Sequence, residues 1–352
     1  MGLPHINRIA TAVPPHEVHA AFCGFALHQL PDPRTRDAFE RLAGKSHIAT
    51  RHSVLEPRPD ATGTTCGFYR LDHFPGTGAR MARYEAEAPA LAEEACEGLG
   101  LEAEGSTITH IILATCTGFA APGLDQWLIR RFGLGGHVER NILGFMGCQA
   151  AINALKLAWH MARSDPAARI LVVNLELCTL HLQPASEPEP LLCSLLFADG
   201  CSAAIVSQEP RGLRMEGFHA ALVTEAAHQI TWRIGDSGFD MTLSGMVPLT
   251  LSRALPDHAD AILGGMPASE VVHWAVHPGG RSVLDAVGRG FELPQGALDV
   301  SRAVLREFGN MSSATVMFVL ERMMRSARTG APGCALAFGP GLSAEAMRFT
   351  AA

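Results

Sequence analysis

Aromatic residues are scarce in this sequence: they make up 6% of its 352 residues, while glycine and alanine are abundant. This composition favours helices packed closely on sheets and disfavours an all-β design. Long apolar runs are missing too, because no stretch approaches the ~20 apolar residues that a membrane-spanning helix needs. The amino-terminal segment also lacks a cationic stretch followed by an apolar one. We therefore expect a soluble, cytoplasmic protein without a membrane span.

An excess of positive charge is absent as well. The net charge is −7, and no run of Lys or Arg interrupts the sequence. Nucleic acid or an anionic membrane is therefore excluded as the main partner. At the same time, 47% of the residues are hydrophobic, which is enough for a large core in one large domain or in two fused halves.

Paired cysteines and metal-binding histidine spacings are missing. The nine cysteines form no CxxC motif, and several lie in apolar runs, so we expect reduced, buried thiols in a reducing compartment. The sixteen histidines show neither HxH nor HExxH spacing. We therefore expect no metal site and no organic cofactor.

What the sequence does contain is an alternation of short apolar runs with helical patterns, which is typical of an α/β protein with sheets covered on both faces. Strands are expected at 108–115, 169–177, 271–276 and from 334 to a glycine-rich turn. Helices are expected at 35–43, 85–99, 124–132, 148–163, 281–291, 298–308 and 312–327. Residues 1–80 are otherwise expected to be irregular, and 183–190 to be a surface loop. The pattern is compatible with two similar halves, 1–210 and 211–352.

The first candidate for chemistry is Cys148 in the segment GFMGCQAA. It would open the buried helix 148–163, where unpaired N–H groups and the helix dipole favour a thiolate. A preceding glycine would let a ligand approach closely. The same position also suits a small buried residue with no catalytic role.

Two further candidates lie at the ends of predicted elements. His277, in AVHPGG, ends an apolar strand, and strand ends are where ligands bind in open α/β sheets. Asn310, in EFGNMSSA, lies between two helices and could donate to an oxyanion. Alternatively, His277 is a hydrogen-bonded turn residue and Asn310 a cap. Papain-type proteases use the same three residue types, but their sequence around the cysteine differs.

Taken together, these motifs resemble one family. GFMGCQAA, AVHPGG, GNMSSA and AFGPGL, in this order and at these separations, resemble the type III polyketide synthases, the chalcone-synthase-like enzymes. Further matches are ITHIILATCTGFAAPGLD, RILVVNLELCTLHLQ and LLFADGCSAAIV, so the likeness spans residues 39–342. CTGF and LELCTLHLQ are closer to bacterial members than to plant chalcone synthases.

The resemblance implies a thiolase-like, five-layered αβαβα fold of two similar halves and a homodimer. Its implied substrates are an acyl-CoA starter and malonyl-CoA. Cys148 would hold the growing chain as a thioester in the amino-terminal half, 1–210. His277 and Asn310, from 211–352, would stabilise the enolate formed when malonyl-CoA loses CO₂; His277 would also pair with the thiolate. The chain would then cyclise to a pyrone, a resorcinol or a related polyketide.

The same resemblance assigns binding residues. Arg41 and Lys45, in AFERLAGKS, match basic positions for CoA, four apart on one helix face, whereas a third basic position is Ala38 here. The gating phenylalanines of the family fall on Phe197 and on Met241. Further positions that line the family's cavity fall on Cys116, Cys178, His181, Trp232 and Ser312.

The cysteines, His181 and Trp232 depart from the plant pattern, which favours a fatty acyl starter over an aromatic one. Two other functions remain open at this stage. One is an enzyme similar to β-ketoacyl carrier-protein synthase III, which would use a carrier protein. The other is a non-catalytic paralogue, which the intact Cys148, His277 and Asn310 disfavour. The starter, the number of extensions and the mode of cyclisation are not fixed by the sequence.

Overall fold

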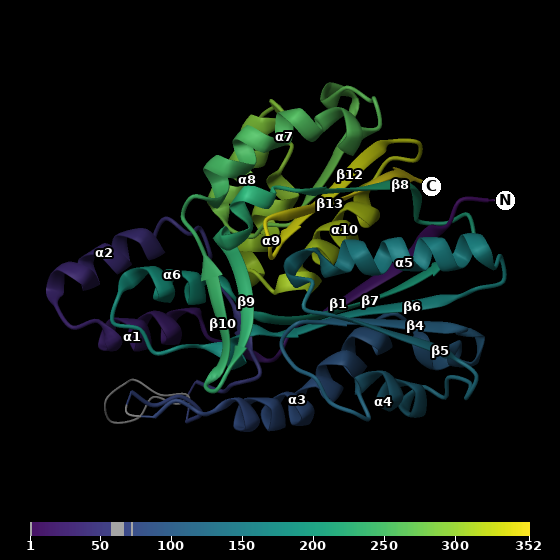
Figure 1. Ribbon diagram of the computed structural model, residues 1–352. Coiled ribbons are helices and arrows are strands. Elements are labelled where there is room, and N and C mark those ends of the chain that lie inside the picture. The colour runs from purple at the N-terminus through teal and green to yellow at the C-terminus, as the bar shows by residue number, and fades with distance from the viewer. Residues whose placement is uncertain (1, 58–66, 72) are drawn as a thin grey trace.

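The computed structural model describes residues 2–57, 67–71 and 73–352, and its largest feature is a nine-stranded sheet (Figure 1). The strand order is β11-β12-β13-β8-β1-β7-β6-β4-β5. These strands are β1 (His5–Ala12), β4 (His110–Thr115), β5 (Glu139–Gly144), β6 (Ile170–Leu177), β7 (Asp199–Ser207), β8 (Leu213–Leu222), β11 (His273–Val276), β12 (Pro332–Gly339) and β13 (Ser343–Ala351).

The sheet has two parts joined by a narrow link. β1 and β8 pair through two residues of each strand, His5 with Arg214 and Ile6 with Leu213. Most neighbouring strands on either side pair over much longer stretches, such as β12 with β13 and β1 with β7. The two parts can therefore diverge and enclose helices between them.

Helices α5 (Ala150–Ser164) and α10 (Thr315–Ser326) fill the space between the two parts of the sheet. α3 (Thr77–Gly98) and α4 (Leu124–Arg131) cover the outer face of β4, β6 and β7. α7 (Val247–Leu263), α8 (Arg281–Gly290) and α9 (Asp299–Phe308) cover the outer face of β11 to β13. The result is five alternating layers of helices and strands (Figure 1).

The sequence explains why α5 can lie in the middle. It carries a series of alanines, and Ala150, Ala154, Ala158 and Ala162 are fully buried. Small side chains let the helix approach a sheet closely on either side. β6 is buried at all eight positions, as expected for a strand that is covered on both faces.

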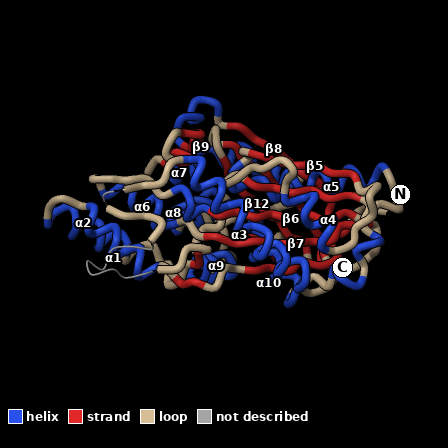
Figure 2. Tube along the Cα trace, turned by 90° about the horizontal axis from the view of Figure 1, so that it is seen from below, coloured by secondary structure: helices blue, strands red, loops and turns tan. Residues whose placement is uncertain are grey.

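A separate helical cluster lies at one end of the molecule. α1 (His19–Gln29), α2 (Pro33–Ala43) and α6 (Pro188–Leu196) pack around Phe39 and Leu191. Both chain termini lie at the opposite end (Figures 1 and 2). Smaller elements include the hairpin of β9 (Ile230–Gly235) and β10 (Gly238–Leu243), the short pair β2 (His16–Glu17) and β3 (His52–Ser53), and several 3₁₀ turns, among them η3 (Gly147–Gln149) and η7 (Ser312–Ala314).

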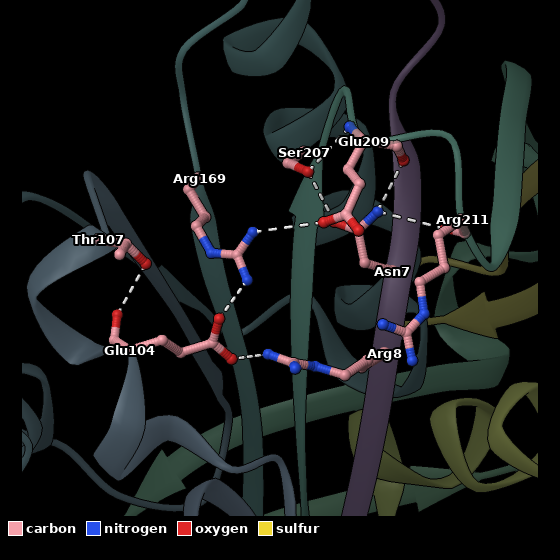
Figure 3. A network of polar contacts seen from close by, with 8 residues as sticks. All are labelled: Asn7, Arg8, Glu104, Thr107, Arg169, Ser207, Glu209 and Arg211. Atoms are coloured by element: carbon pink, nitrogen blue, oxygen red, sulfur yellow. Dashed lines mark hydrogen bonds and ion pairs between the residues drawn. The ribbon is translucent and has the colours of Figure 1, made fainter.

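A polar network fastens β1 at the end remote from the cavity described below (Figure 3). Asn7 donates to the carbonyls of Glu209 and Arg211 at 2.9 and 3.2 Å, and accepts from the Ser207 hydroxyl. Glu104 pairs with both Arg8 and Arg169. These contacts tie β1 to the turn after β7 and to the loop before β4.

Several sequence expectations need correction. Residues 1–80 are more regular than expected, since they contain β1 and α1 as well as α2. α3 begins at Thr77, eight residues before the start expected at 85, so Pro89 lies in mid-helix. The expected loop 183–190 overlaps α6, which begins at Pro188. No described helix is long and apolar enough to cross a membrane.

Candidate active site

Cys148 lies in the 3₁₀ turn η3, between the end of β5 and the start of α5. The turn depends on Gly147, whose φ of +67° is one that other residues rarely adopt. A Cβ at Gly147 would also lie 2.2 Å from the Pro340 ring. The glycine therefore lets the AFGPGL turn press against the backbone just before the thiol.

The Cys148 thiol faces Asn310. Its Sγ is 3.9 Å from Asn310 Oδ1 and 4.0 Å from Nδ2. Burial raises the pKa of the thiol to about 11, with a further contribution from Glu176, while hydrogen bonds from Ser312 and Asn310 oppose the rise. Burial therefore opposes the thiolate that the helix start would favour.

His277 directly follows β11, and its backbone N–H donates to the Leu336 carbonyl of β12 at 2.8 Å. The residue is 1% exposed, and burial lowers the pKa of its imidazole to about 3. Neither ring nitrogen has a hydrogen-bond partner among the described residues. An unpartnered, neutral imidazole in a buried position is available to accept a proton or to bind a ligand oxygen.

Asn310 is held firmly by its surroundings. Its Oδ1 accepts from the Ser312 N–H at 2.9 Å, and its Nδ2 donates to the Gly279 carbonyl at 3.4 Å. Its backbone forms a bridge with Phe197, because Asn310 N–H donates to Leu196 and Asn310 C=O accepts from Ala198. The carbonyl contact of Nδ2 is long, so this donor can be shared with a ligand.

Sequence reasoning missed Glu176, which is fully buried and lies close enough to Cys148 to raise the pKa of its thiol. Its carboxylate accepts from the N–H of Cys116, the hydroxyl of Thr117 and the hydroxyl of Ser313. Burial nevertheless raises its pKa to about 7. A charged residue within the apolar run LVVNLEL was the available signal, since such a residue is rarely buried without a purpose.

The three candidates line one cavity. It contains about 1080 Å³ of empty space, part of it open to solvent. The structure brings all seven other predicted cavity residues to the same walls, namely Cys116, Cys178, His181, Phe197, Trp232, Met241 and Ser312. The eight cysteines within the described residues are free thiols, while Cys66 lies outside them.

One wall of the cavity comes from the β9–β10 hairpin. Trp232 and Met241 face each other across the hairpin, and the Trp232 indole donates to the Cys116 carbonyl at 2.8 Å. His181 stacks on Phe239 at 4.2 Å. Its Nε2 lies 2.7 Å from the Thr117 carbonyl, and burial lowers its pKa to about 4. His181 is therefore a neutral wall residue.

A second cavity adjoins the first. The first, inner cavity and the second, outer cavity are neighbours, because both are lined by Cys193, Leu243, Val247, Gly279 and Val283. Lys45 and Arg281 line the outer cavity. Arg41 is exposed but does not line it. α2 ends at Ala43, so Lys45 lies in the following turn, and the expectation that Arg41 and Lys45 share one helix face is wrong.

Comparison with known proteins identifies the arrangement. The chain matches the chalcone and stilbene synthases, with the amino-terminal domain over residues 5–210 and the carboxy-terminal domain over 217–351. It is 30% identical to the alpha-pyrone synthesis polyketide synthase-like Pks18 of Mycobacterium tuberculosis, over 98% of this chain and 90% of the relative. It is 33% identical to the 1,3,6,8-tetrahydroxynaphthalene synthase of Streptomyces peucetius, over 97% and 91%.

Solved structures agree. The type III polyketide synthase domain of Steely1 from Dictyostelium superposes with a TM-score of 0.90 at 26% identity, over 99% of both chains. The 1,3,6,8-tetrahydroxynaphthalene synthase of Streptomyces coelicolor gives 0.87 at 28%, over 100% of this chain and 99% of the other. The thiolase-like α/β fold expected from the motifs is thereby confirmed. The chain belongs to the chalcone and stilbene synthase family, and it is an acyltransferase of the type III polyketide synthase class.

Proposed function

We propose that Cys148, His277 and Asn310 carry out the condensation, and that the starter is a fatty acyl-CoA. The observation that supports these roles is that all three side chains line one cavity, although they come from three distant parts of the chain. A thiol, an unpartnered imidazole and a carboxamide donor are what thioester exchange and enolate stabilisation require.

Loading would begin with transfer of the Cys148 proton to His277. The thiolate attacks the carbonyl of the acyl-CoA, the C–S bond to CoA breaks, and the CoA thiolate takes up a proton. The raised pKa of the thiol and the lowered pKa of the imidazole mean that the resting pair is neutral. The thiolate–imidazolium pair is then formed only during loading, when the proton moves from Cys148 to His277.

Extension would use malonyl-CoA in the same place. Loss of CO₂ leaves an enolate whose oxygen is negative, and His277 and Asn310 Nδ2 offset this charge. The enolate carbon attacks the Cys148 thioester, a C–C bond forms, and the Cys148 thiolate leaves. The product is a β-ketoacyl-CoA that can be loaded again. Preplaced donors accelerate such a step because they bind the charged state better than the substrate.

CoA would enter through the outer cavity, where Lys45 and Arg281 offer positive charge to its phosphates. Arg281 already contacts His47 at 3.2 Å and Asp285 at 3.6 Å. Both Arg281 and Lys45 line the outer cavity, so both can contact a CoA phosphate there. Arg281 would replace the basic residue that the family has at the position of Ala38.

The apolar lining supports an aliphatic starter. Ile230, Leu243, Val247, Leu251 and Phe338 all line the inner cavity. Alkyl chains gain about 0.8 kcal/mol for each methylene removed from water. One relative is named alpha-pyrone synthesis polyketide synthase-like Pks18, which makes a pyrone or a related ring the expected product class.

A homodimer is part of the proposal, as is a cytoplasmic location. β5 is an edge strand, hydrogen-bonded to β4 on one side. Ile142 on this strand is 47% exposed, and Phe119 and Met146 near it are also exposed. An uncovered edge with apolar side chains is a surface that native proteins cover.

The deciding experiment is product analysis by mass spectrometry. The purified protein is given malonyl-CoA with acyl-CoA starters from acetyl to stearoyl and with benzoyl- and coumaroyl-CoA. Cys148→Ala is the control for the nucleophile, and Cys23→Ala, a half-buried cysteine that does not line the cavity, is the matched control for thiol loss.

We expect polyketide masses with long-chain starters that require Cys148 but not Cys23. Activity restricted to aromatic starters would contradict the fatty acyl assignment. Product formation from malonyl-carrier protein but not from malonyl-CoA would contradict the use of free CoA thioesters.

A further inference from the structure

Arg51 is buried beside the cavity and plays no part in the steps above. The residue is 1% exposed and lines the cavity wall. One amino group of its guanidinium, Nη1, donates to the carbonyls of Ser194, at 3.2 Å, and Phe197. Its Nε lies 3.2 Å from His19 Nδ1, and the guanidinium is stacked 4.7 Å from the Phe22 ring.

The carbonyls that Arg51 binds belong to the end of α6 and the residue that follows it. The last carbonyls of a helix have no partner within the helix, and a cation stabilises them. The two neighbours of Phe197, Leu196 and Ala198, bind the Asn310 backbone. Leu196 C=O accepts from Asn310 N–H at 2.8 Å, and Ala198 N–H donates to Asn310 C=O at 2.9 Å. Segment 196–198 is therefore fixed by Arg51 and Asn310 together.

A second contact links Arg51 to Gly309, the residue that precedes Asn310. Gly309 has a φ of +69°, and a Cβ built there would lie 2.9 Å from both Arg51 Cγ and the Leu196 carbonyl. The backbone just before Asn310 thus rests against the aliphatic stem of Arg51. Any change in the position of that stem is passed on to Asn310.

Burial of the Arg51 guanidinium costs free energy of folding. Burial lowers the pKa of Arg51 to about 10, so the cation persists at neutral pH. The carboxylates of Asp199 and Glu17 lie near enough to favour the cation, but its Nη2 has no hydrogen-bond partner among the described residues. A buried cation that is not fully hydrogen-bonded costs free energy of folding.

We propose that Arg51 is a positioning residue: by holding segment 196–198, it fixes the Asn310 carboxamide beside Cys148 and the Phe197 ring at the cavity wall. This inference rests on the proposed role of Asn310 in decarboxylation. It does not require Arg51 to touch the substrate.

The test measures CO₂ release from malonyl-CoA by the full-length protein carrying Arg51→Lys. A lysine keeps the charge but cannot reproduce the planar fork of a guanidinium. We expect kcat to fall about tenfold or more, because small displacements of a catalytic group cost that much. KM for malonyl-CoA should stay within about threefold, since CoA binds in the outer cavity.

A double-mutant cycle separates positioning from general damage. If Arg51 acts through Asn310, Arg51→Lys should lower the rate by less than about twofold in an Asn310→Ala background. Arg80→Lys is the matched control, because Arg80 is also fully buried and also binds backbone carbonyls, those of Pro75, Leu180 and Leu182. It should leave the rate of CO₂ release within about threefold.

Equal, multiplicative losses in both backgrounds, or an unchanged kcat, would overturn the inference. If Arg51→Lys does not fold, Gly309→Ala displaces the same contact and should give the same selective loss of kcat; a normal kcat in that variant would overturn it too. Failure of the unmodified protein to release CO₂ would instead contradict the proposed function itself.

Discussion

Burial moves the pKa of the Cys148 thiol up to about 11 and that of the His277 imidazole down to about 3. Both shifts favour the neutral pair, so the proposed loading step requires proton transfer from Cys148 to His277. Asn310, which is neutral at every pH, has no part in that proton transfer. Substitutions of His277 and Asn310 should therefore differ in their effects on the rates of acylation and CO₂ release.

Substitution of Asn310 should affect decarboxylation alone, whereas substitution of His277 should also slow loading. We expect His277→Gln to slow acylation of Cys148 by about a hundredfold or more, because proton acceptance is lost. Asn310→Ala should leave acylation within about threefold but lower CO₂ release by about a hundredfold, because one donor to the enolate is removed. Intact-protein mass spectrometry follows acylation, and trapped CO₂ follows decarboxylation. Identical losses in both assays for both variants would contradict the separate roles.

Glu176 should make stability fall as pH rises. Its pKa is raised from 4.5 to about 7 in the folded protein by burial, so the folded state binds the proton more tightly than the unfolded state. The stabilisation is full below pH 4.5 and is lost as pH rises to about 7. Glu176→Gln removes this titration while keeping the hydrogen-bond geometry, since an amide can face Ser313 as donor.

We compare the free energy of unfolding of the wild type with that of Glu176→Gln at pH 5 and at pH 8. The difference between the two proteins should change by about 3 kcal/mol over this interval. The wild type should lose stability relative to Glu176→Gln over this interval, as measured by urea unfolding. Asp199, whose pKa burial raises to about 6, is present in both proteins and cancels. A difference that is constant with pH, or that favours the wild type at pH 8, would be incompatible with the raised pKa.

Individual residues of the site were predictable because their motifs are local. Cys148, His277 and Asn310 each lie at the end of an element whose apolar pattern is visible in the sequence. Their pKa values were not predictable, because burial depends on residues far away in the chain. Arg51 was missed for the same reason: its partners Ser194 and Phe197 lie more than 140 residues away.

Among the secondary-structure elements, those with a clear period or a clear end were found, such as β6 and α9. β1 was missed because Asn7 and Arg8 interrupt its apolar pattern, and only long-range contacts satisfy them (Figure 3). α6 was missed because prolines at its start read as a loop, although proline is well tolerated in the first turn of a helix.

The β9–β10 hairpin should set which acyl chains fit. Trp232 stands edge-on to His181 at 5.4 Å and to Phe239 at 5.7 Å, so it occupies space in the cavity wall. Trp232→Ala should raise the ratio of kcat/KM for palmitoyl-CoA to that for acetyl-CoA by about tenfold. Ile234→Ala on the same strand, where the side chain is 64% exposed, should leave the ratio unchanged. An unchanged ratio in Trp232→Ala would show that the indole does not limit the starter.

For the whole molecule, the sequence pattern predicted an α/β class, whereas the layer order came from the family resemblance. Local patterns do not reveal that β1 lies between β7 and β8, since these partners are about 200 residues away. Nor do they reveal that α5 and α10, which are 150 residues apart, contribute to one buried core. Such long-range pairing is fixed by the combined fit of many apolar faces.

The final prediction concerns the edge strand β5, which we expect to form the interface of a dimer. On its outer side no other strand of the described residues pairs with it, and Ile142 on it is 47% exposed. A second copy would cover the strand edge and the Ile142 side chain, and a charge at position 142 would prevent this contact.

We expect light scattering to give twice the 37.5 kDa chain mass for the wild type, and close to the single mass for Ile142→Glu. Ile234→Glu, on an exposed hairpin position away from the edge, should remain dimeric. A dimer that survives Ile142→Glu would place the interface elsewhere, and a monomeric wild type would show that the exposed edge is stable in water.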